Sequence, residues 1–416
     1  MIAELLGFVT RQEGKKFLRL SEDVDERIVG IPGTGLGPDM SLYIHIPFCR
    51  KLCPFCCFNR YLFKEDKARQ YFLDLRKELD LYISKGYMFS SFYFGGGTPT
   101  ILMDELLSFI DYLNKSFEVK EISIETTPSE INLENIELLK KAGVNRLSVG
   151  VQSFDDDVLR AVGRLHSTGK EAQEKLQLVQ GHFDTVNVDL IFNFPAQTIA
   201  TFKRDVAIFK ELCIDQATFY PLMPSPHKKD AMERKFEHVD NSQEKQYYNV
   251  ILKELYNNPD YRASTAWCFS RGERMIDEYI VDYSDYIGIG SGSVSLIRGN
   301  FYVNSFSLEN YHNLIEADSF PIVRCRELSE REYYRYYMLT KLFGTKLDTG
   351  QFRSSFNADI NRKLLSELGF LKLFGIVEGD EIINVTPRGM YSVSVMMKEF
   401  FAALNGLREH CIKYQI

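Results

Sequence analysis

The chain has 416 residues, of which 45% are hydrophobic and 26% are charged, and its formal net charge is −7. This composition excludes collagen-like, disordered and coiled-coil proteins, and an acidic chain is a poor candidate for nucleic-acid binding, which needs a basic surface. No apolar run approaches the ~18 residues of a membrane span, and the first residues place their basic side chains after the apolar ones, the reverse of a secretory signal, so we expect a cytoplasmic protein without a membrane span.

Strands and helices alternate from Ser41 onward, after an N-terminal segment, 1–40, that shows no clear period and that we expect to be an arm. The predicted strands cover 41–47, 91–94, 121–125, 146–152, 185–192 and 216–222. Helical periodicity follows the strands at 66–85, 104–115, and from about 133, 155 and 200. Six such units in series predict a parallel sheet, either a partial barrel or a doubly wound sheet. In both architectures, ligands bind at the carboxyl ends of the strands.

The pattern of the chain changes after residue 226. We therefore expect four parts: the arm at 1–40, the α/β unit at 41–226, a substrate-side extension at 227–327, and a small, mainly helical domain at 328–416. The last part contains a run of tyrosines at 333–337, which could stack on a planar substrate but is more typical of helix packing.

Four of the eight cysteines lie within nine residues, directly after the first predicted strand. Cys49, Cys53 and Cys56 have the spacing C-x3-C-x2-C, and Cys57 follows at once. Three thiolates can hold three irons of a [4Fe–4S] cluster and leave the fourth iron open for a small molecule. The alternative is a structural zinc site with four thiolates, but such sites usually join two separated C-x2-C arms, which are absent.

Polar residues and glycines follow the next strands in the same way. The glycine-rich segment Gly95–Thr100 comes after the second strand, Glu125 and Gln152 end the third and fourth, and Asp189 lies in the fifth. Glycines let the backbone approach a ligand, and a carboxylate at this edge can hold an ammonium or a ribose hydroxyl. A plain turn and a helix cap are the alternatives for the glycines and for Glu125. Together these residues favour a cofactor site beside the cysteines.

Four motifs of the chain occur in the order and spacing of one known family: YIHIPFCRKLCPFC at 43–56, FGGGTPT at 94–100, GVQSF at 150–154 and DLIFNFPAQT at 189–198. They resemble the oxygen-independent coproporphyrinogen III oxidase-like and haem chaperone-like branch of the radical S-adenosylmethionine (SAM) superfamily. The resemblance implies a partial (β/α)6 barrel with an N-terminal arm and a helical, winged-helix-like C-terminal domain. It implies a [4Fe–4S] cluster on Cys49, Cys53 and Cys56. For SAM it implies the following residues: Tyr43, Phe55, Gly96, Gly97, Thr98, Glu125, Gln152, Arg164 and Asp189.

The chain also departs from both branches of that family. Cys57 comes one residue before the position of the oxidase's fourth cysteine, which is Phe58 here. The region after the barrel lacks the His-Asn-x-x-Tyr-Trp motif of the haem chaperones, and Asn193 stands where the family usually has a glycine.

The resemblance implies a radical enzyme that reductively cleaves SAM to a 5′-deoxyadenosyl radical and modifies a porphyrinogen-like or other small molecule. It also implies a one-electron donor such as flavodoxin or ferredoxin. Two alternatives stay open: a C-methyltransferase that uses two SAM molecules, and a haem-binding chaperone without turnover.

Overall fold

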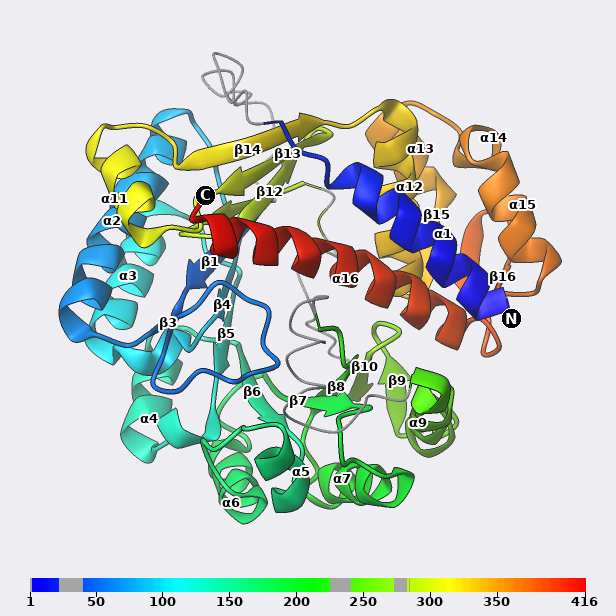
Figure 1. Cartoon of the computed structure of the whole chain (residues 1–416), viewed down its shortest axis with the longest axis horizontal. Helices are drawn as coiled ribbons and strands as arrows, with labels where there is room; N and C mark the ends of the chain where they lie inside the picture. Colours follow the sequence, from blue (N-terminus) through cyan, green and yellow to red (C-terminus); the bar gives the residue numbers. More distant parts are fainter. Residues whose placement is uncertain (1, 22–39, 225–240, 273–282, 284) are drawn as a thin grey trace.

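A 12-stranded sheet forms the centre of the protein (Figure 1), in a computed structural model that describes residues 2–21, 40–224, 241–272, 283 and 285–416. Six neighbouring strands are parallel and follow one another in chain order. These strands are β1 (Ser41–Ile46), β4 (Ser91–Gly96), β5 (Glu121–Thr126), β6 (Arg146–Gln152), β7 (Thr185–Phe192) and β8 (Gln216–Pro221). All six predicted strands are therefore confirmed.

The strand order distinguishes the two predicted architectures. A doubly wound sheet reverses its order at a switch point, whereas here the order from β1 to β8 never reverses. The connecting helices lie on the outer side of the curved sheet in Figure 1. They are α2 (Glu65–Ser84), α3 (Met103–Ser116), α4 (Leu133–Lys141), α5 (Asp156–Ala161), α6 (Gly169–Val179) and α7 (Ile199–Glu211). The prediction of a partial (β/α)6 barrel is confirmed.

Helix α2 illustrates why these segments are helical. Its buried side chains Tyr71, Phe72, Leu75, Leu79 and Tyr82 recur at spacings of three and four residues, so they form one apolar stripe. That stripe packs into the same apolar core as the side chains of the parallel strands, and this fixes the helix on the outside of the sheet.

Further strands extend the sheet at both ends. Strand β11 (Tyr286–Ile289) pairs in parallel with β1 and leads into the antiparallel strands β12 (Val294–Ile297), β13 (Asn300–Asn304) and β14 (Ile322–Glu327). At the other end lie β10 (Cys268–Arg271) and β9 (Tyr261–Ala263), next to α9 (Glu244–Ile251) and a π-helical turn at Leu252–Tyr256. Helix α11 (Leu308–Glu316) packs against α2. The outermost strands β14 and β9 do not pair within the described part of the chain, so the barrel stays open.

The C-terminal region is mainly helical, as the sequence predicts. Its helices are α12 (Glu330–Phe343), α13 (Thr349–Phe356), α14 (Ile360–Lys363), α15 (Leu365–Leu373) and α16 (Met390–Tyr414). A small sheet in the order β15 (Lys346–Asp348), β17 (Ile382–Val385) and β16 (Val377–Glu378) accompanies them. In Figure 1, α16 crosses in front of the sheet from one end to the other.

The N-terminal segment contains a helix that the sequence pattern did not reveal, α1 (Ile2–Phe17), which lies along α16. The contact between α1 and α16 contains two glycines, which carry no apolar signal in the sequence. A Cβ atom at Gly7 would lie 2.8 Å from Cγ1 of Val395, and one at Gly14 would lie 3.1 Å from Cβ of Ala403. Close packing of the two helices thus uses small residues where apolar periodicity would need large ones. Residues 22–39 of the predicted arm and the predicted boundary at 226 lie outside the described residues.

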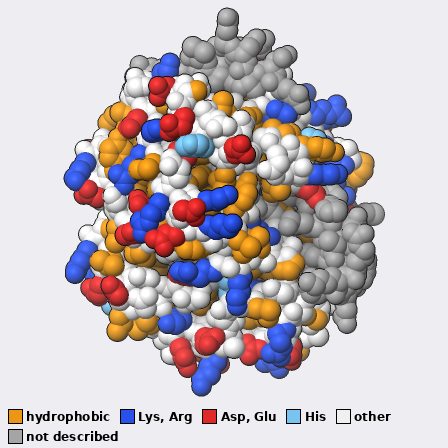
Figure 2. Space-filling view, turned by 60° about the vertical axis from the view of Figure 1, so that its left-hand side comes forward, with side chains coloured by type: hydrophobic (Ala, Val, Ile, Leu, Met, Phe, Trp, Pro, Cys, Tyr) orange, Lys and Arg blue, Asp and Glu red, His pale blue; other side chains and the backbone are white. Residues whose placement is uncertain are grey.

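Acidic and basic side chains are interspersed on the face of the protein that Figure 2 shows. None of the helices in the described ranges is both long enough and apolar enough to cross a bilayer.

Candidate active site

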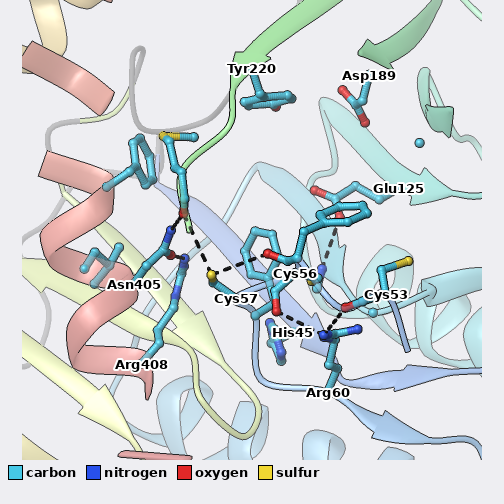
Figure 3. A pocket seen from close by; sticks show the side chains of 18 of the residues that line it. His45, Cys53, Cys56, Cys57, Arg60, Glu125, Asp189, Tyr220, Asn405 and Arg408 are labelled. Atoms are coloured by element: carbon cyan, nitrogen blue, oxygen red, sulfur yellow. Dashed lines mark hydrogen bonds between the residues drawn. The ribbon is translucent and has the colours of Figure 1, made fainter. Parts of the chain in front are cut away.

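Every residue that the sequence predicts for the cluster or for SAM lines one cavity of about 320 Å³ at the carboxyl ends of the parallel strands. Most of these residues come from β1, the loop after it and the strands β4, β5, β6 and β7, because the carboxyl ends of parallel strands meet at one edge of a sheet. Arg164 follows α5. Figure 3 shows Cys53 and Cys56 on one side of this cavity, Asn405 and Arg408 of α16 on the other, and Cys57 between them.

Cys49, Cys53 and Cys56 lie on the loop that follows β1, and all three are free thiols. The loop is held at both ends by the short parallel pair β2 (Phe48–Cys49) and β3 (Tyr61–Leu62). A side-chain nitrogen of Arg60 donates to the carbonyls of Cys53 and Cys56, the latter at 3.0 Å, and so fixes the turn between them. The chain therefore presents the three thiols from a braced loop.

Two metal hypotheses apply to the three thiols. A structural zinc site of the all-cysteine kind takes four thiolates in a tetrahedral shell, whereas a cubane cluster can take three thiolates and leave one iron open. The sulfur of Cys57 faces the carbonyls of Phe55 and Met223. A set of three thiols fits a [4Fe–4S] cluster better than a four-thiolate zinc site.

Side chains that can donate a hydrogen bond lie beside two of the thiols. The Thr98 hydroxyl lies 3.7 Å from the sulfur of Cys49, and a nitrogen of Arg164 lies 3.3 Å from that of Cys53. Burial raises the pKa of Cys49 to about 11, and the hydroxyl of Thr98 opposes this rise. A bound cation would favour the thiolate form, so metal binding and deprotonation of this thiol would be coupled.

Cys57 faces another direction. Its sulfur lies 3.6 Å from the carbonyl oxygen of Phe55 and 3.8 Å from that of Met223, near Asn405 on α16 (Figure 3). Although Cys56 and Cys57 are adjacent in the sequence, their side chains thus point to different sides of the cavity.

The glycine-rich segment after β4 packs directly on the cysteine loop. The backbone N–H groups of Gly97 and Thr98 donate to the carbonyls of Ile46 and Phe48, both at 2.8 Å. A Cβ atom at Gly97 would lie 2.6 Å from the Phe48 oxygen, and one at Gly96, where φ is +109°, would lie 2.5 Å from the His45 ring. Glycine is therefore required at both positions because the segment packs closely on the cysteine loop. The same glycines would also let the backbone approach a ligand.

Tyr43 is oriented by a residue outside the predicted site. Its hydroxyl lies 2.9 Å from Nδ1 of His45, and Nε2 of His45 lies 2.9 Å from the carbonyl oxygen of Asn59. Because a carbonyl only accepts, Nε2 carries the proton and Tyr43 donates to Nδ1. Burial lowers the pKa of His45 to about 4, with the charge of Arg408 acting in the same direction, so the ring is neutral at pH 7.

Phe55 sits on the opposite side of the loop. Its ring centroid lies 5.1 Å from that of Phe194, and it belongs to a small apolar cluster with Val158, Val162 and Leu222. This cluster anchors the turn between Cys53 and Cys56 on the barrel.

Two partly buried carboxylates lie on the floor of the cavity (Figure 3). Glu125 accepts from the Tyr93 hydroxyl at 3.0 Å and from the Gly96 N–H at 3.1 Å. Asp189 accepts from Ser148 at 2.9 Å and from Asn187 at 2.8 Å. Burial, followed by the charge of Asp189, raises the pKa of Glu125 to about 7, and burial also raises the pKa of Asp189. Like charges in a dry site repel, so a cationic ligand group between them would be stabilised.

Gln152 and Arg164 complete the side of the cavity formed by β6. Gln152 has a φ of +76° at an interruption of the β6–β7 register, which turns its side chain toward the cavity. Arg164 donates to the carbonyl of Gly150 and to Cys53. Two residues further on, Nε2 of His166 lies 3.2 Å from the sulfur of Cys53, a contact that only the proximity of His166 to Arg164 in the sequence could have suggested.

The far wall of the cavity was not predicted. It is built by α16 and by aromatic residues from β8, β11 and α12, and it carries Asn405 and Arg408. Tyr336, from the tyrosine run at 333–337, lines this wall, whereas Tyr334 and Tyr337 belong to the apolar core of α12 and α13. No local motif marks Tyr336, Asn405 and Arg408, which lie more than a hundred positions after the barrel motifs.

Comparisons with known proteins agree with this geometry. The model of the radical SAM superfamily matches residues 43–207. The haem chaperone HemW of Bacillus subtilis is 27% identical over 382 residues, which cover 88% of this chain and 99% of that protein. The oxygen-independent coproporphyrinogen III oxidase of a Synechocystis species is 29% identical over 383 residues, 84% of this chain and 82% of that one.

The solved structures give the same result. The coproporphyrinogen III oxidase HemN of Escherichia coli, described as a radical SAM enzyme, superposes with a TM-score of 0.74 at 25% identity over 92% of this chain and 95% of that one. A superfamily match over the barrel, relatives along nearly the whole chain and the same fold all point one way: the chain is a member of the radical SAM superfamily, in the branch of the oxygen-independent coproporphyrinogen III oxidases and haem chaperones.

Proposed function

We propose that this protein is a radical enzyme in which Cys49, Cys53 and Cys56 hold a [4Fe–4S] cluster and the neighbouring strand ends hold SAM. The observation that carries this proposal is the convergence of three free thiols and two partly buried carboxylates on one cavity. When bound and reduced by a one-electron donor such as flavodoxin or ferredoxin, the cluster and SAM would supply a 5′-deoxyadenosyl radical able to remove hydrogen from a C–H bond.

Different residues of the cavity would bind different parts of SAM. Glu125 and Asp189 would attract its positively charged groups, because both carboxylates line the cavity and the charge of Asp189 acts on Glu125. The backbone of Gly96, Gly97 and Thr98 would place the methionine part beside Cys49, to which the Thr98 hydroxyl already points.

The remaining assigned residues would position these groups. Gln152 and Arg164 would contact SAM from the β6 side, while Arg164 also holds Cys53 in place. Tyr43, fixed by His45, and Phe55, fixed by its apolar cluster, would pack beside the cluster and limit the access of water.

The C-terminal region would close the site. A reactive radical needs a dry cavity, and the barrel is open between β14 and β9. Helix α16 bridges this opening: Trp267, next to β10, donates from Nε1 to Ser394 at 2.8 Å, while Cys411 packs with Val294 and Phe301 from β12 and β13. We infer that 328–416 is the substrate-side cover of the 41–226 barrel, that 227–327 lines the substrate side, and that α1, from the arm at 1–40, braces α16.

The substrate that we propose is a porphyrinogen-like tetrapyrrole or another small molecule. The support is the names of the relatives that match the chain almost throughout, together with the aromatic wall opposite the cysteines. The test is anaerobic reconstitution followed by reduction with dithionite in the presence of SAM. We expect roughly four irons per chain and slow formation of 5′-deoxyadenosine and methionine, with coproporphyrinogen III as the first candidate substrate.

A second function, haem binding without turnover, is favoured by one observation, the similarity to the haem chaperone HemW. The two functions differ in a measurable way. An enzyme forms 5′-deoxyadenosine in proportion to a modified product, whereas a chaperone binds haem stoichiometrically and leaves it unchanged. Mass spectrometry of the added tetrapyrrole after turnover separates them.

A further inference from the structure

Hydrogen-bond donors are distributed unevenly over the thiols of the cysteine loop. The sulfur of Cys53 lies 3.2 Å from Nε2 of His166 and 3.3 Å from Nη1 of Arg164. The sulfur of Cys49 lies 3.7 Å from the hydroxyl of Thr98. Cys53 therefore has two donors beside its sulfur, and both lie closer than the donor beside Cys49.

The imidazole is placed against Cys53 by a short, anchored loop. His166 lies in the segment 162–168, between α5 and α6. At the end of this segment, Thr168 begins α6 with a capping box, which fixes the backbone there. In its middle, the carbonyl of Leu165 accepts from Nζ of Lys51 at 2.8 Å, and this bond ties the segment to the cysteine loop. The backbone beside His166 is thus held independently of the imidazole.

The nitrogen has to be the donor when the sulfur is bound to iron. A thiolate in a cluster carries no proton, so it only accepts, and a proton on Nε2 of His166 then completes the contact. In the described part of the chain, this is the one hydrogen bond of the His166 side chain. Arg164 differs, because it also donates to the carbonyl of Gly150 and is assigned to SAM. His166 is therefore the donor that can be removed without removing an assigned SAM residue.

A donor at this sulfur favours the reduced cluster. A [4Fe–4S] cluster gains one negative charge on reduction, and hydrogen bonds to its sulfurs are among the factors that set its reduction potential. A hydrogen bond to an ionised acceptor is stronger when the acceptor carries more charge, so it stabilises the reduced state more than the oxidised state. Cys53 is only 7% exposed, so the bond acts where little water screens it.

We propose that His166 donates from Nε2 to the sulfur of Cys53 in the cluster-bound protein and thereby makes the reduction potential of the cluster less negative. His166 is a positioning residue in this role, because it acts on the cluster through Cys53. The proposal rests on the proposed function for the presence of the cluster. It adds a residue that controls how readily a one-electron donor reduces that cluster.

The experiment is an anaerobic redox titration of the reconstituted full-length protein without SAM, followed by the EPR signal of the reduced cluster. His166→Leu and His166→Phe both remove the donor, and the second keeps a ring. A hydrogen bond to a charged group changes an equilibrium by a factor of about 10 to 100, but only the difference between the two oxidation states counts here. We expect the midpoint potential of both variants to fall by about 59 mV, which is a tenfold change in the ratio of reduced to oxidised cluster.

Two further variants test whether the donor itself is responsible. His166→Gln should recover about half of the shift or more, because its side-chain amide also offers an N–H. His410→Phe should leave the potential unchanged, since His410 is an exposed histidine on α16 whose ring contacts Tyr414. The sign of the shift is also informative. A loop that merely loosened would admit water, which donates to the sulfurs in place of the imidazole, and the potential would not fall.

An unchanged or higher potential in His166→Leu and His166→Phe, or an equal fall in His166→Gln and His166→Leu, would overturn the proposal. Loss of iron from both donor-free variants, with His410→Phe keeping its cluster, would also overturn it, because His166 would then support only the fold of the loop. Iron analysis of the wild type tests the proposed function separately. Without roughly four irons per chain, the proposed function fails, whereas a wild type with its cluster and variants with an unmoved potential refute this inference alone.

Discussion

Replacing Gly97 by alanine tests whether the glycine-rich segment positions the cysteine loop. A Cβ atom at this position would lie 2.6 Å from the oxygen and 2.8 Å from the nitrogen of Phe48, and 2.9 Å from the oxygen of Ile46. All three atoms belong to the backbone that leads into Cys49, so no side chain can rotate away to make room.

The structure gives the size of the disturbance. Ordinary contacts of a Cβ atom begin at 3.4 Å, so the Phe48 oxygen must move by about 0.8 Å, and Cys49 is the next residue. Overpacking of this kind costs about 1–3 kcal/mol. If this cost is relieved by displacing Cys49, the cluster should be held about 5- to 150-fold less tightly.

The assay is the rate at which a chelator such as bathophenanthroline disulfonate removes iron from the reconstituted protein. Gly369→Ala is the matched control, because Gly369 lies in α15 and nothing is within 4 Å of the added atom. Circular dichroism checks that both variants are folded. Iron release at the wild-type rate from folded Gly97→Ala would refute the role of this segment in positioning Cys49.

Three further predictions concern the site and its cover. Cys56→Ala should remove the visible absorbance of the cluster, whereas Cys57→Ala should preserve it, because the Cys57 sulfur faces two carbonyls away from the other thiols; equal losses would contradict a three-thiolate site. The affinity for SAM, measured by equilibrium dialysis, should fall as the pH drops below about 7, since the raised pKa of Glu125 makes that carboxyl neutral there; Glu125→Gln should have a lower affinity at pH 8 and a flatter profile, and an unchanged profile would remove Glu125 from the site. Gly14→Leu should release α1 from α16 and make the N-terminus more sensitive to limited proteolysis, because even a Cβ atom there meets Ala403 at 3.1 Å; Gly406→Leu, where nothing lies within 4 Å of the added atom, is the control, and equal proteolysis would argue against close packing of the helices.

The strands and outer helices of the barrel could be predicted from the sequence because their signals are local. Period-two and period-3.6 patterns depend on neighbours within a few positions, and the buried stripe of α2 is one such pattern. Helix α1 contacts α16 through Gly7 and Gly14, which carry no apolar signal. Its packing partner lies at the opposite end of the chain, so only the folded molecule shows why the glycines are there.

The cysteine loop and the strand ends around it could also be predicted. The reason is topological: in a series of parallel strands, residues that follow each strand meet at one edge, wherever the helices lie. The convergence of Cys49, Glu125 and Asp189 on one cavity is an example. The chemistry of the thiol triplet and the order of the motifs then specify the superfamily.

What faces that edge depends on the tertiary structure. Arg408 and Asn405 stand on a helix with no motif, and they reach the cavity because α16 spans the gap between β10 and the β12–β13 hairpin. His166 enters the site through a contact with Cys53 that no spacing encodes, whereas His45 shares a strand face with Tyr43, two residues away. Local sequence patterns specify secondary structure, whereas the distant contacts that close the cavity and place Arg408 in its wall depend on how the last helix packs across the open barrel.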